Sequence, residues 1–165
     1  MAKSGSKAKG KKAEDDSFLI VARNRRARFE FDLLESVEAG IVLTGTEVKS
    51  LRTGKASLEE AYAGIENEEV WLYGCDIPEY LQANRMNHKP KRPRKLLLHR
   101  KEIDKLIAKA SERGLTIVPL KIYFKEGMAK VEISVARGRK LYDKREALKK
   151  QDAKRDIDRA VRGRG

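Results

Sequence analysis

The chain has little cysteine and no long apolar run, and both shortages narrow its class. Of its 165 residues only Cys75 is a cysteine, so neither a disulfide framework nor a cysteine-based zinc site can form within one chain. No stretch of about 18 apolar residues is present to span a membrane. The charged N-terminus is not followed by the apolar segment of a signal peptide. These absences predict a cytoplasmic protein with no membrane partner.

Catalytic and metal-binding motifs are also lacking. Gly40 and Gly45 have the glycine spacing of a P-loop, but Thr46 and Glu47 follow where lysine and serine or threonine would be needed. The two histidines, His88 and His99, lie in or beside a basic segment. No nucleophile and base stand out as a pair, and no carboxylates cluster in a basic groove. We therefore expect no enzyme activity, no metal and no cofactor.

Positive charge is abundant and is distributed in blocks. The net charge is +13, from 38 Lys and Arg against 25 Asp and Glu. Residues 17–83 are acidic, whereas residues 84–101 contain no acid at all and the last 29 residues carry 12 Lys or Arg against five acids. Blocked charge of one sign indicates a polyanionic ligand such as nucleic acid. A lysine-rich surface that only keeps the protein soluble is the alternative.

Composition divides the chain into three parts. Residues 1–16 are rich in Lys, Ala, Gly and Ser, and we expect a disordered basic arm, either a solubilising end or an RNA-binding one. Residues 17–136 contain the alternating apolar patterns of a folded domain. Residues 137–165 form a basic tail with too few apolar side chains to fold alone.

The folded part predicts a mainly β domain. Strands are expected over residues 18–22, 29–34, 37–43, 61–66, 69–74, 115–124 and 128–136, with Ile117, Val131, Ile133 and Val135 turned inward. Two of the connections, Asn67-Glu68 and Glu126-Gly127, are expected to be the turns of hairpins. Gly40 suggests a bulge or bend. Helices are expected over residues 44–52, where Thr44 and Glu47 match a capping box, and over residues 96–113. We predict a small closed antiparallel OB-type barrel of about six strands with two or three helices.

A long loop over residues 76–94 has prolines at 78, 90 and 93 and a second half whose charges are all basic. Prolines and like charges disfavour packing of this loop against the domain. We therefore expect it to be mobile or to await phosphates, and favour the second.

The tail has charge pairs that suit a helix. Glu146 precedes Lys150 by four residues, and Asp158 precedes Arg162 by four, which is the favourable order. Each pair stabilises a helix by only about 0.2–0.5 kcal/mol. We therefore expect a coil in the free protein and a helix once RNA neutralises the cations. Tyr142 is placed either to stack on an unpaired base or to close the last strand.

Five motifs of this chain resemble the SmpB family of SsrA-binding proteins, which partner transfer-messenger RNA (tmRNA) in bacterial trans-translation. They are Asn24-Arg25-Arg26-Ala27-Arg28, Glu38-Ala39-Gly40, the block from Gly45 to Lys55, Arg94-Lys95-Leu96-Leu97-Leu98, and Asp143-Lys144-Arg145. They occur in the family's order over nearly all of residues 18–165.

The resemblance implies an OB-type barrel that binds the tRNA-like end of tmRNA, as a monomer, one protein to one RNA. The implied RNA-binding residues are Asn24, Arg25, Arg26, Arg28, Glu38, Lys95, Leu97 and Lys130. Glu38 would accept from base or ribose groups rather than touch phosphate. It also implies a tail that enters the small ribosomal subunit at the decoding centre, where a stalled mRNA leaves its channel empty.

The implied ribosome-binding tail residues are Arg139, Lys140, Tyr142, Asp143, Lys144, Arg145, Lys149, Lys150, Lys154, Arg155, Arg159 and Arg162. Many family members carry His where this chain has Tyr142, and larger apolar residues where it has Ala153, Ala160 and Val161. The apolar contacts of the tail helix with its binding site are therefore expected to be weaker than is typical of the family. A ribosomal or assembly protein with an rRNA-threading tail is the alternative function, and an RNA-processing enzyme is a more distant one.

Overall fold

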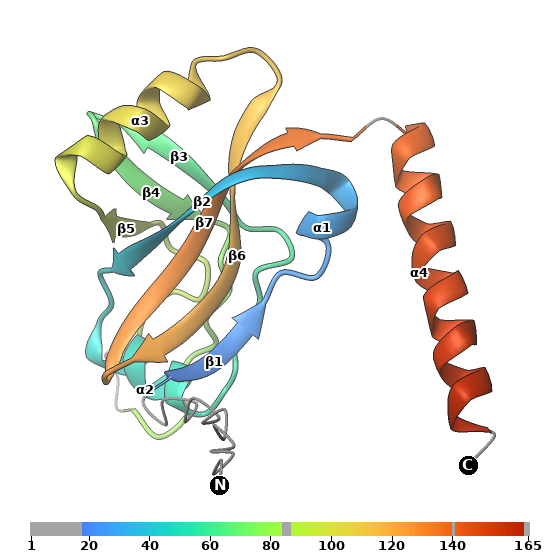
Figure 1. The fold of residues 1–165 in the computed structure, drawn as a ribbon. Helices are drawn as coiled ribbons and strands as arrows, with labels where there is room; N and C mark the ends of the chain where they lie inside the picture. Colours follow the sequence, from blue (N-terminus) through green and yellow to red (C-terminus); the bar gives the residue numbers. More distant parts are fainter. Residues whose placement is uncertain (1–17, 84–86, 140, 164–165) are drawn as a thin grey trace, which may run out of the picture.

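The fold is a single antiparallel sheet that curls into a ring (Figure 1). The structure, a computed structural model, describes residues 18–83, 87–139 and 141–163. Its seven strands are β1 (Phe18–Arg23), β2 (Phe31–Ile41), β3 (Tyr62–Glu66), β4 (Glu69–Tyr73), β5 (Arg94–Leu97), β6 (Leu115–Lys125) and β7 (Met128–Gly138). In the order β1-β6-β3-β4-β5-β2-β7, the last strand pairs back with β6, and β1 is added beside it. The prediction of a mainly β, ring-like fold is confirmed, with seven strands where about six were expected.

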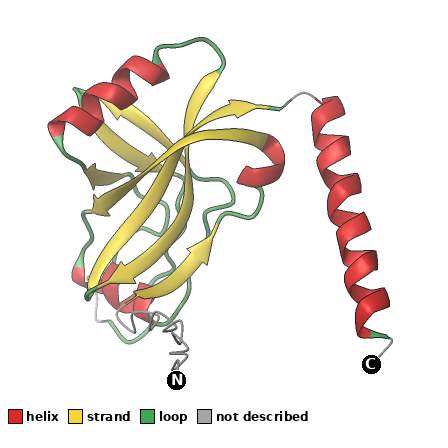
Figure 2. Cartoon of the chain, viewed as in Figure 1, coloured by secondary structure: helices red, strands yellow, loops and turns green. Residues whose placement is uncertain are grey.

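Four helices accompany the sheet (Figure 2). They are α1 (Ala27–Glu30), α2 (Gly45–Arg52), α3 (Arg100–Ala110) and α4 (Leu141–Arg162). The side chains of Leu51 from α2 and Leu106 from α3 enter the core of the ring. Helix α4 lies beside the body rather than over an open end of the ring. The two expected helices of the body are therefore present, together with the single turn α1 and the long α4.

Two tight hairpins were predicted correctly. Asn67 and Glu68, between β3 and β4, both have positive φ angles of 49° and 60°. Glu126 and Gly127, between β6 and β7, have φ angles of 52° and 77°. Two consecutive positive φ angles are typical of the two-residue turn whose twist matches that of the flanking strands. The prediction that four side chains of the second hairpin point into the core is also confirmed, because Ile117, Val131, Ile133 and Val135 are all buried.

Strand β2 corrects three expectations. The two strands predicted over residues 29–34 and 37–43 are one continuous strand, and the first turn of the former is helix α1. The irregularity in its pairing with β7 lies between Leu33 and Glu35, not at Gly40. Gly40 is regularly paired on both sides, with Leu97 and with Lys130. A Cβ at Gly40 would lie 3.2 Å from the Cβ of Leu97, so close strand approach explains this glycine better than a bend.

The helix expected over residues 96–113 begins later. Leu96 and Leu97 belong to β5, and α3 begins at Arg100. His99 is its N-cap, and a reciprocal capping box joins His99 to Glu102, whose carboxylate accepts the His99 backbone N–H at 3.1 Å. The pair of His99 and Glu102, which follows the apolar run of residues 96–98, thus marks the boundary between strand and helix.

Glu47 and the basic loop are joined by a buried ion cluster, which corrects two predictions. The Glu47 side chain does not complete a capping box; it is fully buried and accepts from Arg92 and, at 3.0 Å, from Nε of Arg94. Arg94 is also fully buried and donates to the carbonyls of Cys75 at 2.7 Å and Pro90 at 2.9 Å. The described part of the loop therefore packs against the body, because its arginines are neutralised internally instead of awaiting phosphates.

The tail forms one helix, α4, in this structure. The described side chains from Arg145 to Arg162 are exposed apart from the partly buried Gln151, and Ile157 and Val161 are 63% and 69% exposed. The thin apolar stripe expected from the sequence thus lies open to solvent. The expected change from a free coil to a bound helix concerns two states and stays a prediction. The arm of residues 1–16 and Lys140 lie outside the described residues, as do the side chains of Tyr142, Asp143 and Lys144.

Arg94→Met tests the buried cluster. Because the substitution leaves the Glu47 carboxylate buried with one partner fewer, we expect it to lower the free energy of unfolding by about 3–5 kcal/mol. Urea denaturation measures this loss. The control is Arg100→Ala, which removes a guanidinium exposed to solvent and paired with Glu68 and Asp104. Its cost is expected to be at most about 1 kcal/mol, and equal costs for the two variants would contradict the role of burial.

Candidate nucleic-acid interface

The outer face of β2, β7 and β6 carries the first group of candidate residues. Strand pairing places Lys130 between Gly40 on one side and Tyr123 on the other, and Glu38 opposite Glu132. Because side chains alternate along a strand, these residues project away from the core, whereas Ala39, Val131 and Ile133 point into it.

A groove follows this outer face to the end of β5, and we call it the Glu38 groove. Its lining residues are Glu38, Gly40, Ile41, Leu43, Val48, Leu97, Leu98, His99, Glu102, Met128, Ala129 and Lys130. Three predicted RNA-binding residues, Glu38, Leu97 and Lys130, thus meet in one place although they are far apart in sequence. Leu97 and Met128 are 53% and 63% exposed, so the groove presents apolar surface between an acid and a base.

Glu38 is held as an oriented carboxylate. The hydroxyl of Tyr123 donates to its Oε2, and Nζ of Lys125 lies 3.7 Å from its Oε1. The Tyr123 hydrogen bond is the largest cause that lowers the pKa of Glu38 below its ordinary value, and Lys125 and Lys130 lower it further. Glu38 is therefore ionised at neutral pH and presents acceptor oxygens in a fixed direction.

Tyr123 is a residue of this site that the sequence analysis missed. It lies on the outer face, yet it is only 2% exposed because neighbouring side chains cover it. The ring of Phe18 lies 4.7 Å from its ring, and Nζ of Lys121 lies 5.4 Å from each of the two rings. Burial and the neighbouring Glu38 raise the pKa of Tyr123 above its ordinary value, so the phenol keeps its proton and donates. Its odd position in β6, between Lys121 and Lys125, was the available signal.

The second group of candidates lines a separate groove, between the body and α4, which we call the arginine groove. Its lining residues are Arg23, Asn24, Arg25, Arg28, Phe29, Leu120, Lys121, Glu132, Lys150, Gln151, Lys154 and Arg155. Body residues Arg25 and Arg28 therefore share a groove with tail residues Lys150, Lys154 and Arg155. The sequence assigned these two sets to different partners.

Asn24 has a structural position in this groove. It is 7% exposed, its amide donates to the Pro119 carbonyl at 3.0 Å, and its side-chain oxygen accepts the Ala27 backbone N–H at 3.2 Å. Asn24 thus joins the start of α1 to β6 and fixes where Arg25 and Arg28 project.

Two predicted RNA-binding residues, Arg26 and Lys95, lie outside both grooves. Nε of Arg26 lies 3.8 Å from Glu30 on the same turn of helix. Lys95 faces outward on β5, where its Nζ lies 2.9 Å from Glu69. The structure does not bring either residue together with Glu38.

Arg139 marks the junction of body and tail. Its backbone N–H donates to the Glu30 carbonyl at 2.8 Å, and its Nε donates to Asp32 at 2.9 Å. These bonds extend the contact of β7 with β2 to one residue beyond the strand, two residues before α4 begins. Arg139 is thus attached to the body, unlike the exposed cations Lys149, Arg159 and Arg162 of α4.

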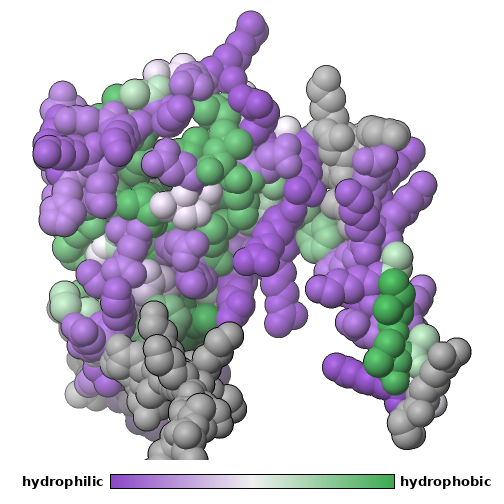
Figure 3. Space-filling view, in the orientation of Figure 1, coloured by the Kyte–Doolittle hydropathy of each residue, from purple (hydrophilic) through white to green (hydrophobic). Residues whose placement is uncertain are grey.

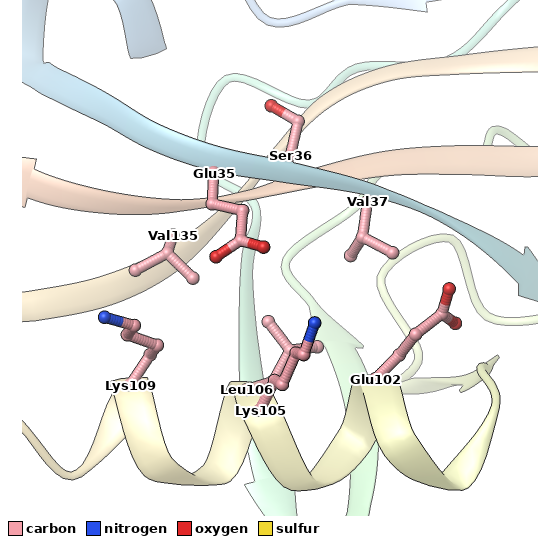
Figure 4. Close-up of a pocket in the computed structure, with 8 residues that line it drawn as sticks. All are labelled: Glu35, Ser36, Val37, Glu102, Lys105, Leu106, Lys109 and Val135. Atoms are coloured by element: carbon pink, nitrogen blue, oxygen red, sulfur yellow. The ribbon is translucent and has the colours of Figure 1, made fainter.

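A smaller cavity of about 150 Å³ lies between α3 and β2 (Figure 4). Its apolar lining residues are Val37, Leu106 and Val135, and its charged residues are Glu35, Glu102, Lys105 and Lys109. Because both signs of charge surround it, this cavity does not suit a polyanion as the two grooves do.

The described parts of the chain show neither a metal cluster nor a membrane-spanning helix. Within residues 18–83, 87–139 and 141–163, no group of three or more His, Cys, Asp and Glu side chains is placed to hold a metal ion. None of the described helices is long and apolar enough to cross a membrane. His88 is buried, with Nδ1 2.9 Å from the Thr46 hydroxyl and Nε2 2.8 Å from the Ile77 carbonyl, so both ring nitrogens have structural partners.

Comparison with known proteins agrees with this geometry. The family model described as SmpB protein matches residues 21–163. The SsrA-binding protein of Azorhizobium caulinodans is 58% identical over 147 residues, which cover 88% of this chain and 92% of that protein. The SsrA-binding protein of Carboxydothermus hydrogenoformans is 54% identical over 145 residues, 88% of this chain and 97% of that protein.

A solved structure has a similar fold. It is described as "tmRNA-SmpB: a journey to the center of the bacterial ribosome", and its matching chain superposes with a TM-score of 0.64 at 47% sequence identity. The match covers 77% of this chain and 93% of that chain.

Tyr123→Phe tests how Glu38 is held. Loss of the donated hydrogen bond is expected to raise the pKa of Glu38 toward its ordinary value of about 4.3, as measured by NMR titration of its carboxyl carbon. Because a lowered pKa stabilises the fold above the unfolded-state pKa, the variant should lose stability at neutral pH, and the difference should vanish on acidification below both pKa values. The control is Tyr62→Phe, which removes a phenol hydroxyl from strand β3, away from Glu38. An unchanged Glu38 pKa in Tyr123→Phe would contradict the assignment.

Proposed function

The chain belongs to the SmpB protein family, and from that membership we propose that it binds tmRNA and acts with it on the bacterial ribosome. Curated relatives are named SsrA-binding proteins, and the similar solved structure pairs SmpB with tmRNA and the ribosome. The observation in this chain that carries the proposal is the Glu38 groove, in which Glu38, Leu97 and Lys130 come together from strands β2, β5 and β7. The role is non-enzymatic, in trans-translation, and the protein works in the cytoplasm.

The Glu38 groove has the chemistry to hold the elbow of a folded, tRNA-like RNA. Lys130 supplies a cation for phosphate, and Leu97 and Met128 supply apolar surface for a ribose or an unstacked base. The oriented carboxylate of Glu38 accepts from base amino or 2′-hydroxyl groups and repels phosphate. A cation, an apolar ridge and an anion in one groove therefore select a folded RNA surface over an ordinary phosphate backbone.

Helix α4 has the properties of a segment that enters a channel walled by RNA. Basic residues outnumber acids among its described side chains, which are exposed apart from Gln151, and its few apolar residues do not attach it to the body. We propose that it occupies the empty mRNA channel of a stalled ribosome, with Tyr142, Asp143, Lys144 and Arg145 at the decoding centre. In this proposal α4 detects that no mRNA is present, and the barrel holds the tmRNA that acts on the stalled ribosome.

Removal of α4 separates the two tasks. A chain ending at Arg139 keeps the bonds of Arg139 to Glu30 and Asp32, and so keeps β7 intact. We expect it to bind the tRNA-like domain of tmRNA with nearly full affinity in a filter-binding assay, and to lose tagging of stalled chains in a reconstituted translation reaction. A chain ending at Arg162, which retains all of α4, is the control. A loss of RNA affinity above about tenfold, or 1.4 kcal/mol, would contradict this division.

Salt dependence tests the electrostatic part of the interface. If about six phosphates are neutralised, the logarithm of the binding constant should fall with a slope near −5 against the logarithm of salt concentration. A slope near zero would exclude a phosphate footprint. Equal abundance on stalled and translating ribosomes would instead favour a ribosomal protein with an rRNA-threading tail.

A further inference from the structure

The arginine groove has cations on both of its walls. Arg23, Arg25 and Arg28 form the body wall, and Lys150, Lys154 and Arg155 form the α4 wall. Figure 3 shows hydrophilic side chains on both sides of the space between the body and α4. Lys150 and Lys154 are one helical turn apart, so their cations follow one another at about 6 Å along the wall. The groove therefore presents two facing rows of positive charge.

Few acids compensate these charges inside the groove. Glu132 is the acid in the groove, and its carboxylate lies 3.2 Å from Nζ of Lys121, which lines the same groove. No ion pair joins the body to the described side chains of α4. The exposed Leu148, Ile157 and Val161 do not line the groove, so burial of these apolar side chains does not hold α4 in place either. Like charges facing each other across solvent repel, and the arrangement needs an anion between its walls.

The shape and composition of the groove indicate which anion. Cations along both walls of a groove fit an extended chain of charges better than a single phosphate. Arginine guanidinium groups bind phosphate oxygens through paired donors, and the body wall has three of them. Phe29 lines the same groove and is half-buried, which leaves ring surface for a base. Phosphates on two sides and an aromatic ring are the features of a site for single-stranded RNA.

We infer that the arginine groove binds one single-stranded segment of RNA, distinct from the RNA in the Glu38 groove, and that this strand fixes α4 against the body. The inference rests on the proposed function for the class of ligand. The body arginines and the α4 lysines then act on one strand together. Without RNA the two walls repel and α4 is released from the body; with RNA the strand bridges them.

A measurement of the distance between the body and α4 tests whether RNA fixes the helix against the body. Spin labels are attached to the full-length chain through Glu59→Cys on the body and Asp158→Cys on α4, both exposed and outside the groove. The native Cys75 is fully buried, and burial raises its pKa to about 11, so it resists labelling. We expect a broad distribution of label distances in the free protein and a single narrow one after a ten-nucleotide single-stranded RNA is added. A distribution that RNA leaves unchanged would overturn the inference.

Charge reversal on one wall supplies the specific test. In the doubly substituted Lys150→Glu, Lys154→Glu chain, glutamates face the body arginines, so the distribution should narrow without RNA and oligonucleotide binding should weaken. Two lost phosphate contacts should reduce the steepness of the salt dependence by about 1.4. The matched control, Lys149→Glu with Arg159→Glu, changes the net charge equally on residues that do not line the groove. An equal effect of the control would mean general attraction, and would overturn the site.

Two further comparisons identify the source of the strand and separate this inference from the proposed function. If the tRNA-like domain alone narrows the distribution of label distances, the strand belongs to tmRNA. If the narrowing requires isolated small ribosomal subunits, the strand belongs to ribosomal RNA. Leu97→Asp, in the Glu38 groove, should abolish binding of the tRNA-like domain and leave the oligonucleotide response intact. If Leu97→Asp binds that domain normally, the proposed elbow site fails while the arginine groove stands. If neither RNA narrows the distribution, the arginine groove fails alone.

Discussion

The buried carboxylate of Glu47 is the constraint on which much of the body depends. Glu47 lies on α2, and its two oxygens receive the guanidinium groups of Arg92 and Arg94 from the basic loop and β5. Arg94 in turn binds the carbonyls of Cys75 and Pro90, so one side chain closes both ends of a long connection. Burying an ion pair is costly unless its remaining donors and acceptors are satisfied, and here most of them are. The cluster therefore specifies one position for the loop and for the start of β5.

That position determines the candidate RNA site. Three residues after Arg94, Leu97 pairs with Gly40, where the absence of a side chain lets β5 approach β2 closely. Gly40 also pairs with Lys130 on β7, so the glycine is the point at which β5, β2 and β7 meet. The groove around Glu38 is a consequence of this close approach. Its chemistry comes from the outer face of the sheet, and the buried ion cluster holds the start of β5, the strand that carries Leu97.

Sequence reasoning succeeded where a local pattern decides the structure. The two hairpins at residues 67–68 and 126–127 and the inward positions of β6 and β7 follow from turn residues and alternation. It failed where a partner that is distant in sequence decides the position of a side chain. Glu47 matched a capping box because Arg94, which binds it in the fold, is 47 residues away in sequence. Arg92 and Arg94 were interpreted as free cations for the same reason, and Tyr123 was missed because its partner Glu38 lies 85 residues away.

The same comparison separates two kinds of positive charge in this chain. Arg92 and Arg94 have a carboxylate of their own and act on the fold, whereas Arg25, Arg28 and the described cations that α4 presents to the body have no ion-pair partner across the groove. Composition counts both kinds alike, so net charge alone overstates the surface available to RNA. Charge becomes evidence for a ligand only where the fold leaves it unneutralised. By that criterion most of the described arginine charge of the basic loop is not available to phosphate, whereas the cations that line the arginine groove are available.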